Sequence, residues 1–137
     1  MIDKNELEQT YQTQALLFRA LMHPTRLAIL DILRDGEQCV CHMEATLGYR
    51  QAYISQHLMV LREANLVEDR REGWNIFYRV TQPEIYAVLD EVRQMLGMPA
   101  PAPIPTPPAA CPCPHCQTDS EMLRLDEQVN ISKQMDP

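Results

Sequence analysis

The sequence lacks a long apolar run and an even set of cysteines, and its opening residues do not have the pattern of a leader; each observation argues against a class of protein. No uninterrupted apolar stretch approaches the roughly 20 residues that a transmembrane helix needs, so we expect no membrane partner. The opening residues, MIDKNELEQT, are polar and acidic, which predicts neither a secretory signal nor a transit peptide and therefore a cytoplasmic location. Five cysteines cannot form a fully paired disulfide framework within one chain, so we favour metal binding or redox chemistry over structural disulfides.

The sequence also has no excess of basic residues. Its 137 residues carry 12 Lys and Arg against 19 Asp and Glu, a formal net charge of −7. Between residues 50 and 79, five arginines face four acidic residues, a local net of +1 (5 − 4). Overall charge mainly sets solubility and non-specific association, so it neither supports nor excludes a specific nucleic-acid partner.

Apolar residues at helical spacing predict two helices at the start of the chain. The first spans 5–22 and stops before Pro24, because proline disfavours helical geometry in the residue before it. Pro24 can open the second helix at its first turn, and Asp35-Gly36 ends that helix.

Two further helices follow. The third covers roughly 40–47 and closes at Gly48. The fourth runs from about 50 to 64, buries Ile54, Leu58 and Leu61, and ends near Asn65, which tolerates a left-handed cap. The pattern is therefore a pair of helices separated by a short turn.

The spacing of apolar residues then changes from the helical period to an alternation with polar residues. Segment 66–80 predicts a hairpin with Gly73 at its tip, because apolar and polar residues alternate in its second half. After Pro83 the helical period returns in an apolar stripe that suits a dimer contact or a cover for the domain's own core. This stripe consists of Ile85, Val88, Leu89, Val92 and Leu96.

The end of the chain is rich in proline. Eight prolines between residues 99 and 114 predict an extended polyproline segment that resists folding. Beyond it, Thr118 and Glu121 have capping-box spacing, so a short helix and disorder are both open there. We therefore divide the chain into a domain over 1–97 and a proline-rich, cysteine-containing tail over 98–137.

A helix pair followed by a hairpin with a charged tip is the element order of a winged helix-turn-helix, a mainly α fold with a small β-hairpin. In that fold the second helix of the pair, here 50–64, lies in the DNA major groove. Its exposed face and the hairpin supply side chains for base edges and phosphates, although a packing role is open for His57. The candidates are Arg50, Gln51, Tyr53, Ser55, Gln56, His57, Arg62, Arg70 and Arg71.

Four segments carry a resemblance to a known family. LMHPTRLAILDIL, EQCVCHMEATLG, ISQHLMVLREANLV and DRREGWNIFYRV occur in an order and spacing that resembles the ArsR/SmtB family of metal-sensing repressors. The resemblance covers roughly residues 15–97 and does not include 98–137. It implies a homodimeric winged-helix repressor that leaves double-stranded operator DNA when an inducer binds. It also implies that CVC at 39–41 is the family's cysteine metal box.

Cys39 and Cys41 lie two positions apart, and such positions point to different faces of a regular helix. They can converge at the frayed start of the third helix, where the helix N-terminus also favours a thiolate. We therefore interpret the pair as metal ligands, with burial as small apolar side chains as the alternative.

The chain departs from the family's arsenic sensors at Glu44, where those sensors have a third cysteine. The tail offers the missing sulfur, because 13 residues separate Gly97 from the first tail cysteine and an extended linker of that length reaches about 40 Å. A tail that traps an ion by itself is the alternative. The full set of candidate ligands is Cys39, Cys41, Cys111, Cys113 and Cys116, with His42 and His115 as bystanders.

The number of sulfur ligands determines which inducer fits. Three thiolates suit As(III) or Sb(III), whereas four suit Cd(II), Pb(II) or Zn(II). Some relatives bind zinc through histidine and carboxylate on the last helix, but segment 84–97 contains no histidine, so we expect no such site.

The expected mechanism is negative allostery, in which ion binding ties the third helix to the tail and moves the helix pair out of its DNA-binding geometry. The nearest alternative keeps the fold and senses oxidation or persulfidation through a disulfide between the two cysteine clusters. We expect no enzyme, because neither cluster has a nucleophile–base arrangement. A metal-sequestering protein would differ by binding no operator.

Overall fold

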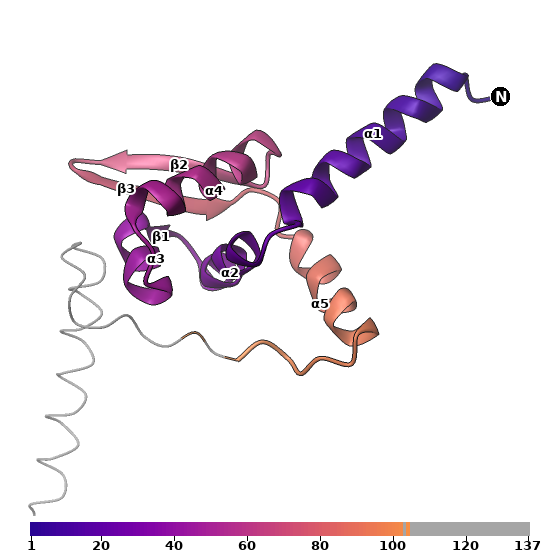
Figure 1. The fold of residues 1–137 in the computed structure, drawn as a ribbon. Helices are drawn as coiled ribbons and strands as arrows, with labels where there is room; N and C mark the ends of the chain where they lie inside the picture. The colour runs from indigo at the N-terminus through magenta and orange to yellow at the C-terminus, as the bar shows by residue number, and fades with distance from the viewer. Residues whose placement is uncertain (103, 105–137) are drawn as a thin grey trace, which may run out of the picture.

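Helix α1 (Lys4–Leu21) extends away from the rest of the domain in the computed structural model, which describes residues 1–102 and residue 104 (Figure 1). His23 then interrupts the helical path, since its backbone is extended and its Nδ1 accepts the Thr25 N–H at 3.1 Å. Pro24 is the first residue of α2 (Pro24–Ile32), where a missing N–H costs nothing. The 3-10 turn η1 (Leu33–Asp35) continues α2 to Gly36, so the predicted boundaries of this helix are confirmed.

The predicted helix pair is also confirmed. Helix α3 (Val40–Leu47) ends at Gly48, whose φ of 72° is left-handed and whose N–H donates to the Glu44 carbonyl at 2.8 Å. Helix α4 (Gln51–Glu63) follows and leads to Asn65, which has a φ of 58°. A left-handed residue thus ends each helix and redirects the chain.

The sheet has one more strand than the hairpin that the sequence predicts. Strands β2 (Val67–Glu72) and β3 (Asn75–Val80) pair antiparallel as expected, and β1 (Gln38–Cys39) adds to the other edge of β3 in the order β1-β3-β2. A strand of two residues has no periodicity, so the alternation of apolar residues could not reveal it. In consequence Cys39 lies opposite Phe77 in the sheet.

The hydrophobic core lies where α2, α3 and α4 meet the base of the sheet. The predicted burial of Ile54, Leu58 and Leu61 is confirmed, since each is 0% exposed. They pack with side chains from the other elements, which fixes α4 on the domain by its apolar face and leaves its polar face outside. The other fully buried members of this core include Ile29, Leu30, Met43 and Leu66.

Helix α5 (Ile85–Met95) is held on α2 and η1 by polar contacts. The Tyr86 hydroxyl donates to the Leu30 carbonyl at 2.7 Å, and Arg34 donates to both carboxylate oxygens of Asp90 at 3.0 and 2.9 Å. Arg93 donates to Asp31 at 2.6 Å. These contacts hold one side of α5 on the domain.

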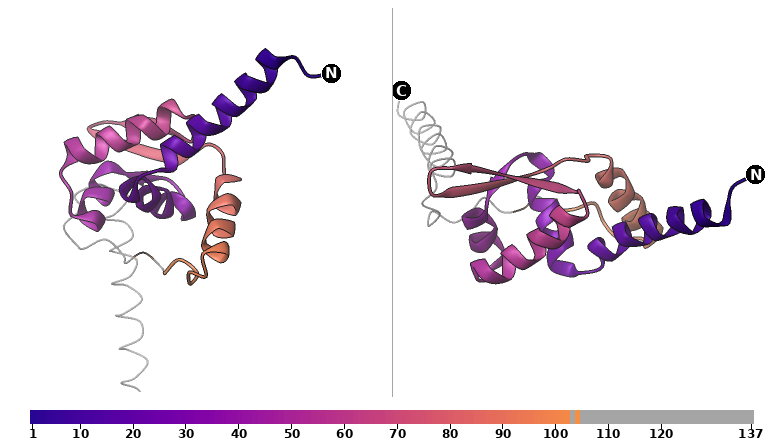
Figure 2. Two further views of the ribbon diagram at one scale, coloured as in Figure 1. Left: turned by 45° about the vertical axis from the view of Figure 1, so that its right-hand side comes forward. Right: turned by 90° about the horizontal axis from the view of Figure 1, so that it is seen from above.

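The outer sides of α1 and α5 are uncovered in the single chain. Phe18 on α1 is 51% exposed, and Val92 on α5 is 41% exposed. Both helices lie at the end of the molecule opposite the tip of the β2–β3 hairpin (Figure 2). Other apolar side chains exposed on the two helices are Leu7, Tyr11, Leu16, Val88 and Met95. Within the described residues no helix has the length and apolarity that crossing a membrane would require.

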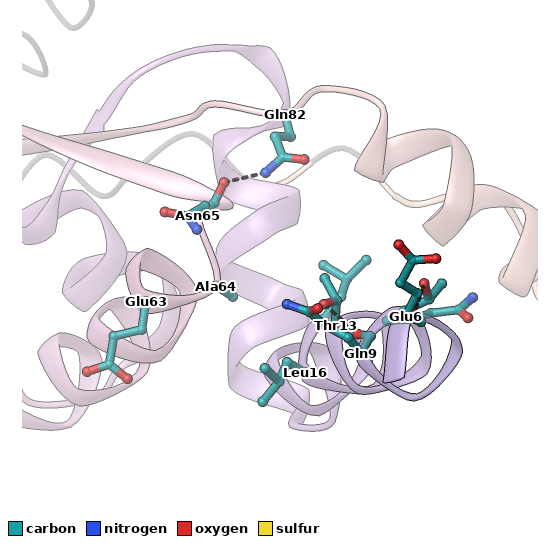
Figure 3. Close-up of a pocket in the computed structure, with 11 residues that line it drawn as sticks. Glu6, Gln9, Thr13, Leu16, Glu63, Ala64, Asn65 and Gln82 are labelled. Carbon is teal, nitrogen blue, oxygen red and sulfur yellow. Dashed lines mark hydrogen bonds between the residues drawn. The ribbon is translucent and has the colours of Figure 1, made fainter. Parts of the chain in front are cut away.

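A hollow of about 850 Å³ opens between α1 and the end of α4 (Figure 3). Its walls include Glu6 and Thr13 from α1, Glu63 from α4, and Gln82, whose Nε2 donates to the Asn65 carbonyl at 2.7 Å. None of the described residues that line it is cysteine or histidine, so the hollow is not the thiol site that the sequence predicts.

Candidate nucleic-acid interface and cysteine pair

The start of α4 presents polar and aromatic side chains to solvent. Arg50, Gln51 and Gln56 are exposed, Tyr53 is 37% exposed, and Ser55 is half-buried. Arg50 is the N-cap residue, so its side chain lies beside the positive end of the helix dipole, which also attracts a phosphate. The geometry suits DNA recognition, although the individual contacts remain predictions.

His57 does not lie on this exposed face, and that part of the prediction is wrong. Its side chain is 8% exposed and is enclosed by residues from three segments. Its ring lies 4.2 Å from that of His23 and 4.7 Å from that of Tyr53, and its Nδ1 is 3.1 Å from an Arg26 nitrogen. Burial, and then the charges of His23 and Arg26, lower the pKa of His57 below its usual 6.5. The packing alternative is therefore the correct one.

Most arginines of the helix and hairpin are already paired with carboxylates. Arg62 lies 3.3 Å from Asp69, and Arg79 pairs with Glu68. Arg70 pairs with Glu72 at 2.9 Å and with Glu37, and its guanidinium lies 4.9 Å from the centre of the Phe77 ring. The charges of these three arginines are therefore already compensated within the protein.

Two arginines have their charge available. Within the part of the chain that the structure describes, neither Arg50 nor Arg71 forms an ion pair. Arg71 lies on β2 near the hairpin tip, where Gly73 has a φ of 59° and Trp74 is fully exposed. We therefore expect Arg50 and Arg71 to contribute more to phosphate binding than Arg62 or Arg70.

The cysteine pair lies at the start of α3, as the sequence predicts. Cys39 is the N-cap residue, with its Sγ accepting the His42 N–H at 3.3 Å, and its side chain is 2% exposed. Cys41 is half-buried and packs in one cluster with Cys39 and Phe77. A helix N-terminus stabilises a thiolate, so this position favours metal binding as well as capping.

The described residues do not complete a metal site. They contain no group of three His, Cys, Asp or Glu side chains that could hold an ion. Cys111, Cys113 and Cys116, together with His115, lie outside the described residues, so their approach to Cys39 and Cys41 remains a prediction.

Sequence reasoning missed two polar residues of this region. Arg26 donates to His57 and also to the carbonyls of Ala20 and Arg19 at the end of α1, at 2.6 and 3.2 Å. Glu37 joins the segment before β1 to the hairpin through Arg70. Neither residue stands out in the sequence, because only the folded chain brings it to a distant partner.

Comparison with known proteins shows that the sequence is similar to bacterial transcriptional regulators. The model of the arsR family of bacterial regulatory proteins matches residues 23–69. A biofilm growth-associated repressor of Agrobacterium fabrum is 37% identical over 93 residues, which cover 68% of this chain and 80% of that protein. The arsenic resistance transcriptional regulator ArsR1 of Pseudomonas putida is 42% identical over 74 residues, 53% of this chain and 57% of that protein.

Solved structures match the fold. The homodimeric winged helix-turn-helix DNA-binding domain Mb0332 of Mycobacterium bovis, a possible ArsR-family regulator, has a TM-score of 0.62 and 26% identity over 73% of this chain and 97% of that chain. Reduced HlyU from Vibrio cholerae has a TM-score of 0.59 and 31% identity over 66% of this chain and 95% of that chain. Nearly the whole length of each known chain therefore has a counterpart here.

Proposed function

Because the chain belongs to the arsR family of bacterial regulatory proteins and is a transcriptional regulator rather than an enzyme, we propose that it represses transcription until a thiophilic ion binds its cysteines. Its fold is a mainly helical winged helix-turn-helix with a three-stranded antiparallel sheet. The single observation that carries the proposal is that Cys39 caps the start of α3, the helix that precedes α4, and packs with Cys41.

The ion would bind Cys39 and Cys41 together with sulfur from the tail. Two thiolates do not fill the coordination shell of As(III), Sb(III), Cd(II), Pb(II) or Zn(II). Cys111, Cys113 and Cys116 raise the number of available sulfurs to five, enough for either a three-sulfur or a four-sulfur site. Similarity to an arsenic resistance regulator favours the three-thiolate ion As(III).

The repressor would act as a homodimer on double-stranded operator DNA. Helices α1 and α5 lie at one end of the molecule (Figure 2), and burying their exposed apolar side chains against a second copy removes them from water. The Mycobacterium bovis domain of the same fold is homodimeric. In such a dimer the two copies of α4 read two half-sites of the operator.

Induction would follow from the place of the cysteines between the two DNA-facing elements. Helix α3 packs on α4, and Cys39 pairs with Phe77 of the hairpin. An ion that draws α3 toward the tail thus biases both the recognition helix and the wing. The same coupling weakens ion binding when DNA is bound, by about 1–3 kcal/mol.

The test is fluorescence anisotropy of a labelled fragment of the protein's own promoter under reducing conditions at pH 8. As(III) is expected to release the DNA, and Cd(II) is titrated separately to distinguish a four-sulfur site. Cys41→Ser should keep operator binding and lose release, and a chain truncated after Gly97 should behave likewise. Undiminished release from Cys41→Ser would refute the assignment of Cys41, and undiminished release from the truncated chain would refute the role of the tail.

The second candidate is a redox-sensing or persulfide-sensing repressor of the same fold. It is favoured by the presence of two separate cysteine clusters and by similarity to HlyU, whose structure was solved in a reduced form. In the same assay an oxidant would then release the DNA, a dithiol reductant would restore binding, and neither ion would have an effect.

A further inference from the structure

His57, whose side chain is buried, lies at the centre of a polar cluster that joins α4 to α2 and to the residue that caps α2. Arg26 on α2 donates to it, while His23 and Tyr53 pack against its ring at 4.2 and 4.7 Å between ring centres. Tyr53 in turn contacts the ring of Tyr49 at 4.9 Å. Tyr49 and Tyr53 are both exposed at the start of α4, so the cluster connects the protein interior to the surface that faces DNA.

The hydrogen bonds of the cluster require a neutral imidazole. A guanidinium nitrogen can only donate, so the contact from Arg26 at 3.1 Å assigns the acceptor role to Nδ1 of His57 and places its proton on Nε2. The Nδ1 of His23 likewise accepts the Thr25 N–H that caps α2. An imidazolium has a proton on both nitrogens and can accept neither bond.

The charges around His57 also oppose a proton. Arg26 faces it from α2, His23 faces it from the link between α1 and α2, and the neutral phenol of Tyr53 faces it from α4 itself. Burial has the largest effect, and both His23 and Arg26 act in the same direction, lowering the pKa of His57 below 6.5. Protonation would place an imidazolium against the guanidinium of Arg26 and break the bond between them.

The hydrogen bond between Arg26 and His57 also affects the position of α1. The same guanidinium caps the end of α1 through the carbonyls of Ala20 and Arg19, so it couples the position of α1 to that of α4. Helix α1 is one of the two helices with an uncovered apolar face, whereas α4 carries the candidate DNA contacts. A proton on His57 would break this polar link between the two helices.

We propose that neutral His57, held by Arg26, is a positioning residue for the start of α4, and that its protonation weakens DNA binding without any involvement of the cysteines. The inference rests on the DNA-binding part of the proposed function and not on the inducer. The expected direction of the pH effect on DNA binding is distinctive. Acidification makes this acidic protein less negative, which would by itself strengthen binding to DNA.

The experiment measures the Kd of the full-length reduced protein for its promoter fragment between pH 8 and pH 5.5 at fixed ionic strength. We expect the wild-type Kd to rise about threefold over this range, because a proton that binds the free protein more tightly than the DNA-bound protein weakens DNA binding as the pH falls toward the pKa of His57. Far-UV circular dichroism at each pH confirms that the chain remains folded.

Two matched variants locate the proton. His57→Asn places a carbonyl oxygen near the position of Nδ1, so it should bind at pH 8 and lose the acid effect. His23→Asn retains a capping acceptor for Thr25 and should keep the acid effect. A wild-type Kd that stays constant or falls with acid overturns the proposal, and so does an unchanged acid effect in His57→Asn. Failure of As(III) or Cd(II) to release DNA at pH 8 would refute the ion-sensing function alone.

Discussion

Replacing Cys39 by alanine and by serine separates its structural role from its proposed role as a ligand. The Cys39 Sγ accepts the His42 N–H, one of the N–H groups at the start of α3 that have no partner within the helix. Alanine removes the acceptor, whereas serine supplies a hydroxyl oxygen at the same position. Because both variants lack the thiolate, both should lose induction, but they should differ in stability.

The expected loss in free energy of unfolding follows from two properties of Cys39: it caps α3, and its side chain is buried. Loss of a side-chain N-cap costs about 0.5–2 kcal/mol, and the side chain of Cys39 is only 2% exposed, so alanine also leaves a small void beside Phe77. We expect Cys39→Ala to lower the free energy of unfolding by about 1–2 kcal/mol and Cys39→Ser to lower it by about 1 kcal/mol less. For a folded domain of about 100 residues, 1 kcal/mol corresponds to roughly 4–8 °C in Tm.

Urea unfolding followed by far-UV circular dichroism checks this order. The three proteins are compared at one protein concentration and with reductant, because the stability of a dimer depends on concentration. Equal destabilisation by alanine and serine would refute the capping role of the thiol. A serine variant as stable as wild type that no longer responds to the ion would establish that loss of induction is a loss of a ligand and not of the fold.

Three further changes test other contacts of the domain. Tyr86→Phe should cost about 1 kcal/mol in urea unfolding, because it removes the hydroxyl that donates to the Leu30 carbonyl at 2.7 Å. Gly48→Ala should lower the free energy of unfolding by about 1 kcal/mol, because a φ of 72° strains any residue other than glycine. Nothing lies within 4 Å of the added methyl group, so a clash cannot explain the loss. The hydrogen bond from Arg34 lowers the pKa of Asp90 below 3.8. The stabilisation of the folded protein by ionised Asp90 is therefore present above pH 3.8 and is lost as the pH falls through the lowered pKa. Thermal unfolding of Asp90→Asn should therefore depend less on pH below pH 4 than that of wild type.

The helical part of the fold could be predicted because its boundaries are local. Pro24, Gly48 and Asn65 each have a conformational preference that acts within a few residues, and each is found where that preference predicts. The third strand could not be predicted, because β1 exists only through its pairing with β3, which lies about 40 residues away in the sequence. Local preference thus determined the helices and the β2–β3 hairpin, and long-range pairing determined the third strand.

The candidate DNA interface was predictable in its location and less so in its members. Helical spacing correctly places Ile54 and Leu58 inside, but it also places His57 near the edge between the two faces, where spacing alone cannot assign it. Its burial depends on Arg26 and His23, which come from other segments. The pairing of Arg70 with Glu37 depends in the same way on the folded chain.

The short strand that escaped prediction gives the cysteine pair its mechanical importance. Cys39 is at once the last residue of β1 and the N-cap of α3, so it cannot move without disturbing either the sheet or the helix. Through the sheet it lies opposite Phe77, over which the guanidinium of Arg70 is stacked, and Glu37 ties the same guanidinium to the segment just before β1. Through the helix it acts on α4, which packs against α3. An ion that bound Cys39, as we propose, would therefore need only a small displacement of this one residue to change both α4 and the hairpin.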